Sequence, residues 1–175
     1  MKDLSFPIRP FRFEPGNTEQ HTKDILSIQS FAGDLETAVK DIKEEQLEWP
    51  YRPDGWTIRQ VIHHCADSHG NGITRFKLAL TEDNPRIKPY DQDGWAALPD
   101  VSTPIVFSLG ILYGLHMRWA VLLQHMSPED FNRTFFHPER DADVSLYEMT
   151  ALYGWHSRHH LAHVKQALES GGQYQ

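Results

Sequence analysis

Residues 56–80 read WTIRQVIHHCADSHGNGITRFKLAL, and this stretch combines a helical pattern with an unusual density of histidine. Its apolar residues recur mostly at intervals of three and four, which places them on one face of an α-helix. Thr57 and Gln60 match a capping box, in which the two side chains satisfy backbone N–H groups at a helix start. The stretch therefore predicts a helix over about residues 57–81, which Gly70 and Gly72 weaken without ending it.

Three further segments carry the same spacing, over about residues 18–44, 105–126 and 145–170. The last of them opens with Ser145 and Glu148, spaced as a second capping box, and a pair of glycines follows its end. A Ser-Pro pair at 127–128 predicts a short helical start with proline in the first position.

Two segments lack such periodicity. Residues 1–17 are rich in proline and aromatic side chains, and we expect an extended arm whose phenylalanines anchor it to the body of the protein. Residues 81–104 hold four prolines and exceed the usual bundle connection of roughly 2–8 residues, so a crossover is possible and simple up-down topology is not assured. With no convincing strand, the sequence predicts one all-α domain over residues 1–175, a four-helix bundle with a long crossover loop and an extended N-terminal arm.

Composition narrows the classes of function. The 175 residues have a formal charge of −7 and no stripe of Lys and Arg, which argues against nucleic acid as a partner. The apolar runs are shorter than the roughly 20 residues of a spanning helix, and the start lacks the apolar core of a secretory signal. Cys65 is the only cysteine, so an intrachain disulfide is impossible and a reducing cytoplasm is the expected location.

Seven of the eleven histidines fall into two patches, three in residues 63–69 and four in residues 156–163. Histidines four apart on a helix project from one face and can bind one metal ion. The second patch offers two such pairs, His156 with His160 and His159 with His163. At about 100° per residue, His160 lies close to the apolar direction of its helix and His156 at its edge, whereas the other pair points toward solvent. We therefore prefer His156 and His160.

A third ligand is expected from the first patch, where His63, His64 and His69 compete. Periodicity does not decide among them, although His69 lies within the apolar stripe and ranks first by angle. Three histidine ligands without a thiolate leave coordination positions open, which is typical of catalytic metal sites. Zinc is the default ion for such ligands, with nickel, manganese and iron as alternatives.

Three stretches together resemble the DinB/YfiT-like family: YRPDGWTIRQVIHHCADSH (51–69), RFKLALTEDNPRIKPYD (75–91) and LYGWHSRHHLAH (152–163). The resemblance covers nearly the whole chain and is closest to the YfiT branch, whose members are described as metal-dependent hydrolases. It implies a four-helix bundle of unusual connectivity, one divalent metal ion between helices, and a homodimer. It also implies His64, His156 and His160 as the ligands, which overrides the angular preference for His69.

The resemblance implies a hydrolase that acts on a small-molecule substrate. Related proteins include thiol S-transferases of the bacillithiol or mycothiol type, which form a second hypothesis at the same site. A non-catalytic metal- or ligand-binding protein is the third. No general base and no organic cofactor site is assigned from the sequence.

Several other residues have two interpretations. Asp67 either orients a ligating imidazole or is solvated, and Cys65 is expected to be a small buried residue rather than a nucleophile. Arg75 and Lys77 are charges suited to an anionic substrate, with ordinary surface charge as the default. Trp95, in the long loop, is a candidate to cover a pocket.

Overall fold

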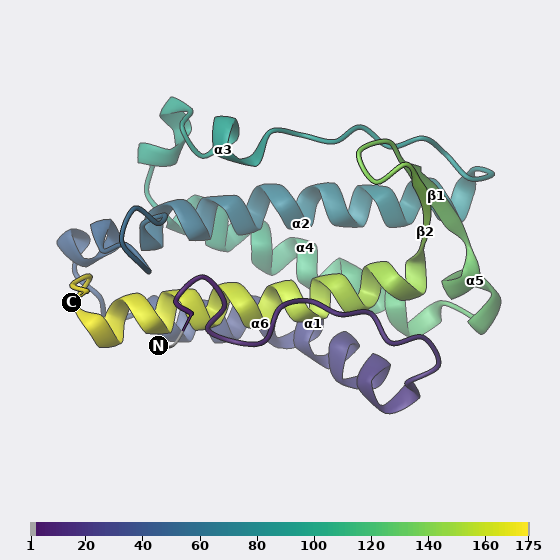
Figure 1. The fold of residues 1–175 in the computed structure, drawn as a ribbon, viewed down its shortest axis with the longest axis horizontal. Helices are drawn as coiled ribbons and strands as arrows, with labels where there is room; N and C mark the ends of the chain where they lie inside the picture. The colour runs from purple at the N-terminus through teal and green to yellow at the C-terminus, as the bar shows by residue number, and fades with distance from the viewer. Residues whose placement is uncertain (1–2, 175) are drawn as a thin grey trace.

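The computed structural model describes residues 3–174, and four long helices dominate it (Figure 1). They are α1 (Thr18–Val39), α2 (Ile58–Thr81), α4 (Val106–His125) and α6 (Leu146–Ser170). The capping box at Thr57 and Gln60 is present, and Ser145 caps α6 by accepting the Glu148 N–H at 3.1 Å. The Glu148 side chain does not close the second box, because it pairs with Arg140 at 2.9 Å instead.

The order of the helices around the bundle differs from their order in sequence. α1 packs against α4 and α6, and α2 packs against the same two helices, so consecutive α1 and α2 lie across the bundle from each other. The segment after α2 returns along the length of the molecule, so α4 runs parallel to α2 (Figure 1). The long loop is therefore a crossover, and the four-helix bundle is confirmed.

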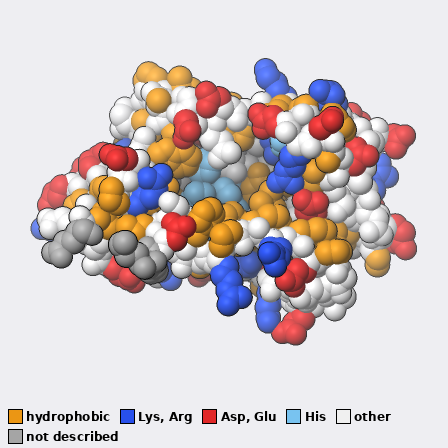
Figure 2. Space-filling view, in the orientation of Figure 1, with side chains coloured by type: hydrophobic (Ala, Val, Ile, Leu, Met, Phe, Trp, Pro, Cys, Tyr) orange, Lys and Arg blue, Asp and Glu red, His pale blue; other side chains and the backbone are white. Residues whose placement is uncertain are grey.

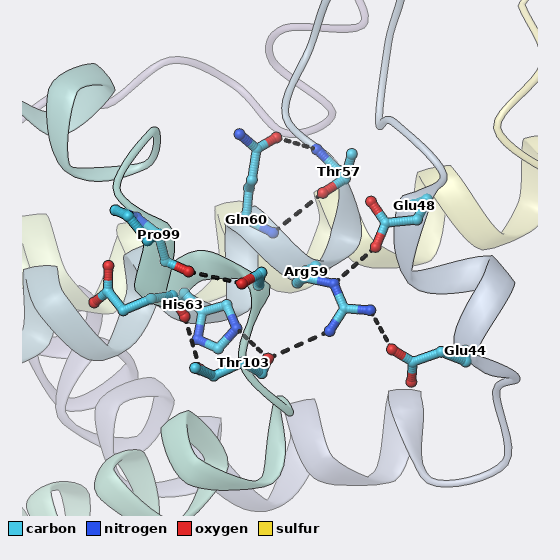
Figure 3. Close-up of polar contacts among 10 residues, drawn as sticks. Glu44, Glu48, Thr57, Arg59, Gln60, His63, Pro99 and Thr103 are labelled. Atoms are coloured by element: carbon cyan, nitrogen blue, oxygen red, sulfur yellow. Dashed lines mark hydrogen bonds and ion pairs between the residues drawn. The ribbon is translucent and has the colours of Figure 1, made fainter.

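The crossover segment contains two short helices, α3 (Gln92–Trp95) and η2 (Pro99–Ser102). Arg59 fixes its end, because its guanidinium donates to the carbonyl of Thr103 at 3.3 Å and also pairs with Glu44 and Glu48 of η1 (Glu44–Glu48) (Figure 3). The Trp95 side chain is 40% exposed and packs beside Tyr90, rather than covering the histidines.

Two local expectations were wrong. α1 ends at Val39 and not near residue 44. Ile42 packs against the core from the turn that follows the helix, so its apolar side chain does not continue the helical pattern. After α5 (Pro128–Asn132), strands β1 (Thr134–His137) and β2 (Ala142–Ser145) form an antiparallel hairpin. Phe135 and Val144 pair across it and are buried, but one inward residue in each short strand gives no recognisable alternation in the sequence.

Residues 3–17, which form the described part of the arm, run without helix or strand along α6 (Figure 1). Residues 1–2 of the expected arm lie outside the described residues. Trp155 Nε1 donates to the carbonyl of Arg9 at 2.8 Å, and Gln166 Nε2 donates to the carbonyl of Leu4 at 2.9 Å. Phe11 packs on Trp155 and Phe13 on Tyr147, so aromatic residues anchor the arm as expected.

α4 is more apolar than expected from the short apolar runs in the sequence. Within residues 3–174, α4 is the one helix that is long and apolar enough to cross a membrane. Only a third of its most apolar stretch is buried in the bundle. The exposed large side chains of this helix, between 53% and 62% accessible, are Val106, Phe107, Ile111, Tyr113, Met117 and Val121.

Candidate metal centre

The two histidine patches meet inside the bundle. α2 supplies His64, and α6 supplies His156 and His160 from adjacent turns. One ring nitrogen of each side chain lies within 4.8 Å of those of the other two, and His64 Nε2 is 3.3 Å from His156 Nε2. Three imidazole nitrogens that converge in this way have the spacing of a shared divalent ion.

Burial keeps these imidazoles neutral. It lowers the pKa of His64 to about 4 and the pKa values of His156 and His160 well below their ordinary value. Because only a neutral imidazole has a lone pair to donate to a metal, the ligand form is already present at neutral pH. Donor type, convergence and protonation state all fit a divalent ion of the zinc class.

His64, His156 and His160 form a cluster of ring nitrogens. A cavity of about 500 Å³ opens onto this cluster at His64 and His160. Figure 2 shows histidine side chains, in pale blue, at the bottom of a hollow in the surface. Phe6 from the arm, Tyr51 and Trp56 provide aromatic walls. The remaining lining residues are polar: Ser5, Arg52, Asp54, Gln92, Asp93, His159 and His163.

A family model described as the DinB superfamily matches residues 29–164. The chain belongs to the DinB superfamily. A Bacillus mycoides (strain KBAB4) protein named "Putative metal-dependent hydrolase" is 46% identical over 170 residues, or 97% of this chain and 98% of its own length. A Bacillus pumilus (strain SAFR-032) protein of the same name is 44% identical over 174 residues, or 97% of each chain.

One solved structure extends the likeness to three dimensions. "YfiT from Bacillus subtilis is a probable metal-dependent hydrolase with an unusual four-helix bundle topology" is its description. It superposes with a TM-score of 0.91 at 40% identity and covers 98% of this chain and 99% of its own. The DinB/YfiT-like family and its bundle are therefore confirmed for this chain, whose relatives are named for metal-dependent hydrolysis.

In this DinB-superfamily bundle, His69 lies behind the cluster and not in it. Its ring is fully buried, with Nε2 at 2.9 Å from His156 Nδ1 and Nδ1 at 2.7 Å from His116 Nε2. The angular ranking that placed His69 first among the candidate ligands thus picked a residue in contact with a cluster histidine. His116 is buried in the core.

His63 points away from the cluster. Its Nδ1 lies 2.7 Å from Ser108 Oγ, and its Nε2 lies 3.1 Å from the carbonyl of Thr103 (Figure 3). It therefore helps Arg59 to hold the end of the crossover segment. Of the two other histidines in the first patch, His63 and His69, only His69 contacts a cluster histidine.

His159 and His163 were expected on the solvent side, and this was wrong: their side chains are 7% and 2% exposed. The arm and the segment before α2 cover them. His159 stacks on Trp155 with a centroid distance of 4.3 Å, and His163 stacks on Tyr51 at 3.7 Å. Helical angles did not predict the burial of these two histidines, because the segments that cover them have no periodic pattern.

The remaining candidates are resolved by their contacts. Burial raises the pKa of the Cys65 thiol and makes it a poor nucleophile. The Asp67 carboxylate has no hydrogen bond to a histidine within residues 3–174, so it does not orient a ligand there. Arg75, with Tyr90 and His156, lines a second cavity of about 220 Å³. Lys77 is exposed.

The residues that sequence reasoning missed are those forming the walls of the cavity. Tyr51, Arg52 and Trp56 all fall within YRPDGW, a stretch that breaks the helical pattern and contributes to the family resemblance. Pro53 and Gly55 could have signalled a tight turn, and the positive φ of 55° at Asp54 fits one. The turn returns the chain so that Tyr51 and Trp56 both face the histidines.

Proposed function

We propose that this protein is a metal-dependent hydrolase in which His64, His156 and His160 hold one divalent ion per chain. The convergence of their nitrogens within 4.8 Å beneath an open cavity carries the proposal. Zinc is the proposed ion because three imidazoles suit it, with nickel, manganese and iron as alternatives. The substrate is a small molecule, since the cavity of about 500 Å³ falls within the usual range of small-ligand pockets.

A divalent ion held by three histidines supplies Lewis acidity, which lowers the pKa of a coordinated water to about 7 or activates another nucleophile. The protein supplies the shape of the cavity. Phe6, Tyr51 and Trp56 provide apolar surface against which a substrate can be oriented. Arg52 supplies a cation at the same wall, which suits a substrate with an anionic group.

The proton acceptor for hydrolysis is proposed to be one of two carboxylates. Asp54 and Asp93 are the acidic side chains that line the cavity, and both are exposed. A carboxylate that lies at the mouth can exchange protons with solvent. Asp54→Asn and Asp93→Asn separate the two, because only the variant that lacks the acceptor loses kcat while retaining metal.

Metal content tests the site directly. Untagged wild-type protein is expected to hold about one equivalent of divalent metal by elemental analysis, whereas His64→Ala and His160→Ala hold none and remain helical by circular dichroism. His63→Ala is the matched control, because it removes the adjacent histidine on α2 and is expected to retain the metal. Full retention in both ligand variants, or no metal in wild type after reconstitution, would refute the proposal.

Transfer of a thiol to an electrophile is the second candidate, and the presence of two cavities favours it. One cavity reaches the cluster at His64 and His160, and the other reaches it at His156, while Gln92 lines both. Two separate reactants therefore have access to one centre. Metal-dependent conjugation of a model electrophile with bacillithiol, without hydrolysis of ester or amide substrates, would select this function.

A non-catalytic site is the third candidate. It predicts metal binding without turnover in either assay, and unfolding or loss of ligand binding when the metal is removed. Turnover that disappears with a chelator and returns with added metal excludes it.

We also propose a cytoplasmic homodimer formed through α4. The family resemblance implies a homodimer, and we propose a second copy as the occupant of the exposed apolar face of α4. Gly110 and Gly114 lie one turn apart on this helix, and a Cβ added at either would have no neighbour within 4 Å. Glycines spaced in this way allow two helix backbones to approach closely.

A further inference from the structure

A chain of buried imidazoles runs from the cluster into the core. His156 Nδ1 lies 2.9 Å from His69 Nε2, and His69 Nδ1 lies 2.7 Å from His116 Nε2. His116 Nδ1 in turn faces the backbone carbonyl of Ile28 on α1 at 2.5 Å. Four helices thus contribute to one line of hydrogen bonds, in which His69 and His116 are 0% and 1% exposed.

The carbonyl at the end of this line sets its direction. A carbonyl oxygen only accepts, so His116 must carry its proton on Nδ1 and donate it to Ile28. A neutral imidazole has one N–H, so His116 Nε2 accepts, and His69 must donate from its own Nδ1. Because His69 also has only one N–H, its Nε2 accepts, and His156 must donate to it from Nδ1. The lone pair of His156 therefore lies on Nε2, the nitrogen that faces His64.

A shorter chain stands behind the other α6 residue of the cluster. His163 Nε2 lies 3.2 Å from the carbonyl of Ser5 in the arm, and His163 Nδ1 lies 3.4 Å from His160 Nδ1. His163 must donate to Ser5, which leaves its Nδ1 to accept from His160 Nδ1. The lone pair of His160 is then also on Nε2.

We propose that His69 with His116, and His163 alone, are positioning residues whose contacts with the Ile28 and Ser5 carbonyls fix the tautomers of His156 and His160. Both cluster histidines then present Nε2 lone pairs. This assignment rests on the proposed metal site for its purpose, but the tautomers themselves are properties of the metal-free protein.

An intermediate histidine differs from the usual partner of a ligand. Metal-binding histidines commonly donate their second N–H to a carboxylate, a backbone carbonyl or water, and the first two of these only accept. An imidazole can either donate or accept, so His69 alone would not decide the tautomer of His156. The Ile28 carbonyl decides it through two rings, which gives His116 a role although it touches neither the cavity nor the cluster.

Nitrogen NMR of the metal-free protein tests the proposal without any activity assay. In ¹⁵N-labelled wild type, Nδ1 of His69, His116, His156 and His160 is expected to show the shift of a protonated nitrogen, and Nε2 that of an unprotonated one. His163 is expected to show the reverse pattern. His156 protonated on Nε2, or a mixture of its tautomers, would overturn the proposal in wild type alone.

A pair of variants separates positioning from packing. His69→Phe fills the space without hydrogen bonds, so His156 is expected to lose its single tautomer and zinc affinity to fall roughly 10- to 100-fold. His69→Gln is expected to rescue both, because its amide oxygen can accept from His156 while its NH₂ donates to His116. Equal zinc affinity in His69→Phe and wild type, measured by chelator competition, would contradict the proposal.

Failure of the metal site has a different signature. If wild type bound no zinc and its tautomers were as assigned, the proposed function would fall while the hydrogen-bond chains stood. If zinc bound at His64, His156 and His160 but His156 carried its proton on Nε2 in the metal-free protein, the chains would fall and the function would stand.

Discussion

The carboxylate of Asp24 on α1 lies 2.8 Å from the guanidinium of Arg158 on α6, and the Asp24 side chain is almost fully buried. This ion pair joins the two helices one turn from Gly154, where their backbones approach closely. A Cβ added at Gly154 would lie 2.6 Å from Asp24 Cα, which is backbone and has no space to move. The absence of a side chain at Gly154 therefore determines how closely α1 packs on the helix that carries His156 and His160.

Gly154→Ala is consequently expected to lower the free energy of unfolding by about 1–3 kcal/mol, the usual cost of overpacking. Gly33→Ala is the matched control, because it lies in α1 with nothing within 4 Å of the added Cβ. There the substitution is expected to raise the unfolding free energy by up to about 1 kcal/mol through helix propensity. Urea unfolding of both variants measures the difference, and equal effects would contradict the close approach.

Stability is expected to fall in mild acid. Burial lowers the pKa of His116 and of His64 to about 4, below the roughly 6.5 of an unfolded chain. Between these values the unfolded state binds protons that the folded state excludes, so stability is complete above about pH 6.5 and is lost toward pH 4. Each such histidine lowers the free energy of unfolding by on the order of 3 kcal/mol as the pH falls from about 6.5 to about 4.

Unfolding free energies of metal-free protein at pH 7.5, 6.0 and 5.0 check this expectation. His125→Ala is the control, since His125 is exposed and lies outside the buried histidines. An unfolding free energy that stays constant between pH 7.5 and 5.0 would show that these histidines are not held neutral.

Arg59 is expected to control the order of the crossover segment without affecting metal content. Arg59→Met keeps much of the side-chain volume but removes the bonds to Glu44, Glu48 and Thr103. Faster proteolytic cleavage within residues 83–104, with about one equivalent of metal retained, is the expected result. Arg118→Met serves as the control, because Arg118 is exposed and forms no ion pair in residues 3–174. Cleavage at the wild-type rate would assign the anchoring elsewhere.

If α4 forms the dimer interface, a charge on its apolar face is expected to convert the dimer to a monomer. Met117→Glu places a charge on the apolar face, where its desolvation on pairing is unfavourable, so sedimentation should report a monomer. Leu26→Glu is the control, because Leu26 is similarly exposed at 56% but lies on α1. A dimer that persists in Met117→Glu, or that dissociates equally in Leu26→Glu, would exclude this face.

The helices could be predicted from the sequence because their signals are local. The Thr57 capping box joins residues three apart, and the α2 stripe repeats within one element. The choice between His64 and His69 was not accessible in this way. A helical projection assumes one buried direction, whereas α2 packs on both α4 and α6. His69 faces His116 of α4, and His64 faces α6.

The burial of His159 and His163 depends on segments far away in the chain. Ser5 and Phe6 of the arm and Tyr51 before α2 cover them, and none of these lies in a periodic pattern. The hydrogen-bond chain through His69 was likewise hidden, because its direction depends on a backbone carbonyl on α1. The family resemblance supplied the candidate ligands, but their supporting contacts required the three-dimensional arrangement.

The position of α1 opposite α2 has a consequence for how the chain acquires its structure. The first two helices cannot complete their packing as a local hairpin, because the main partners of both are α4 and α6. During synthesis, at roughly 5–20 residues per second, their apolar faces stay uncovered for seconds until α6 has been made. Contacts between such distant segments slow folding, so we expect chaperones to engage the nascent chain in this interval.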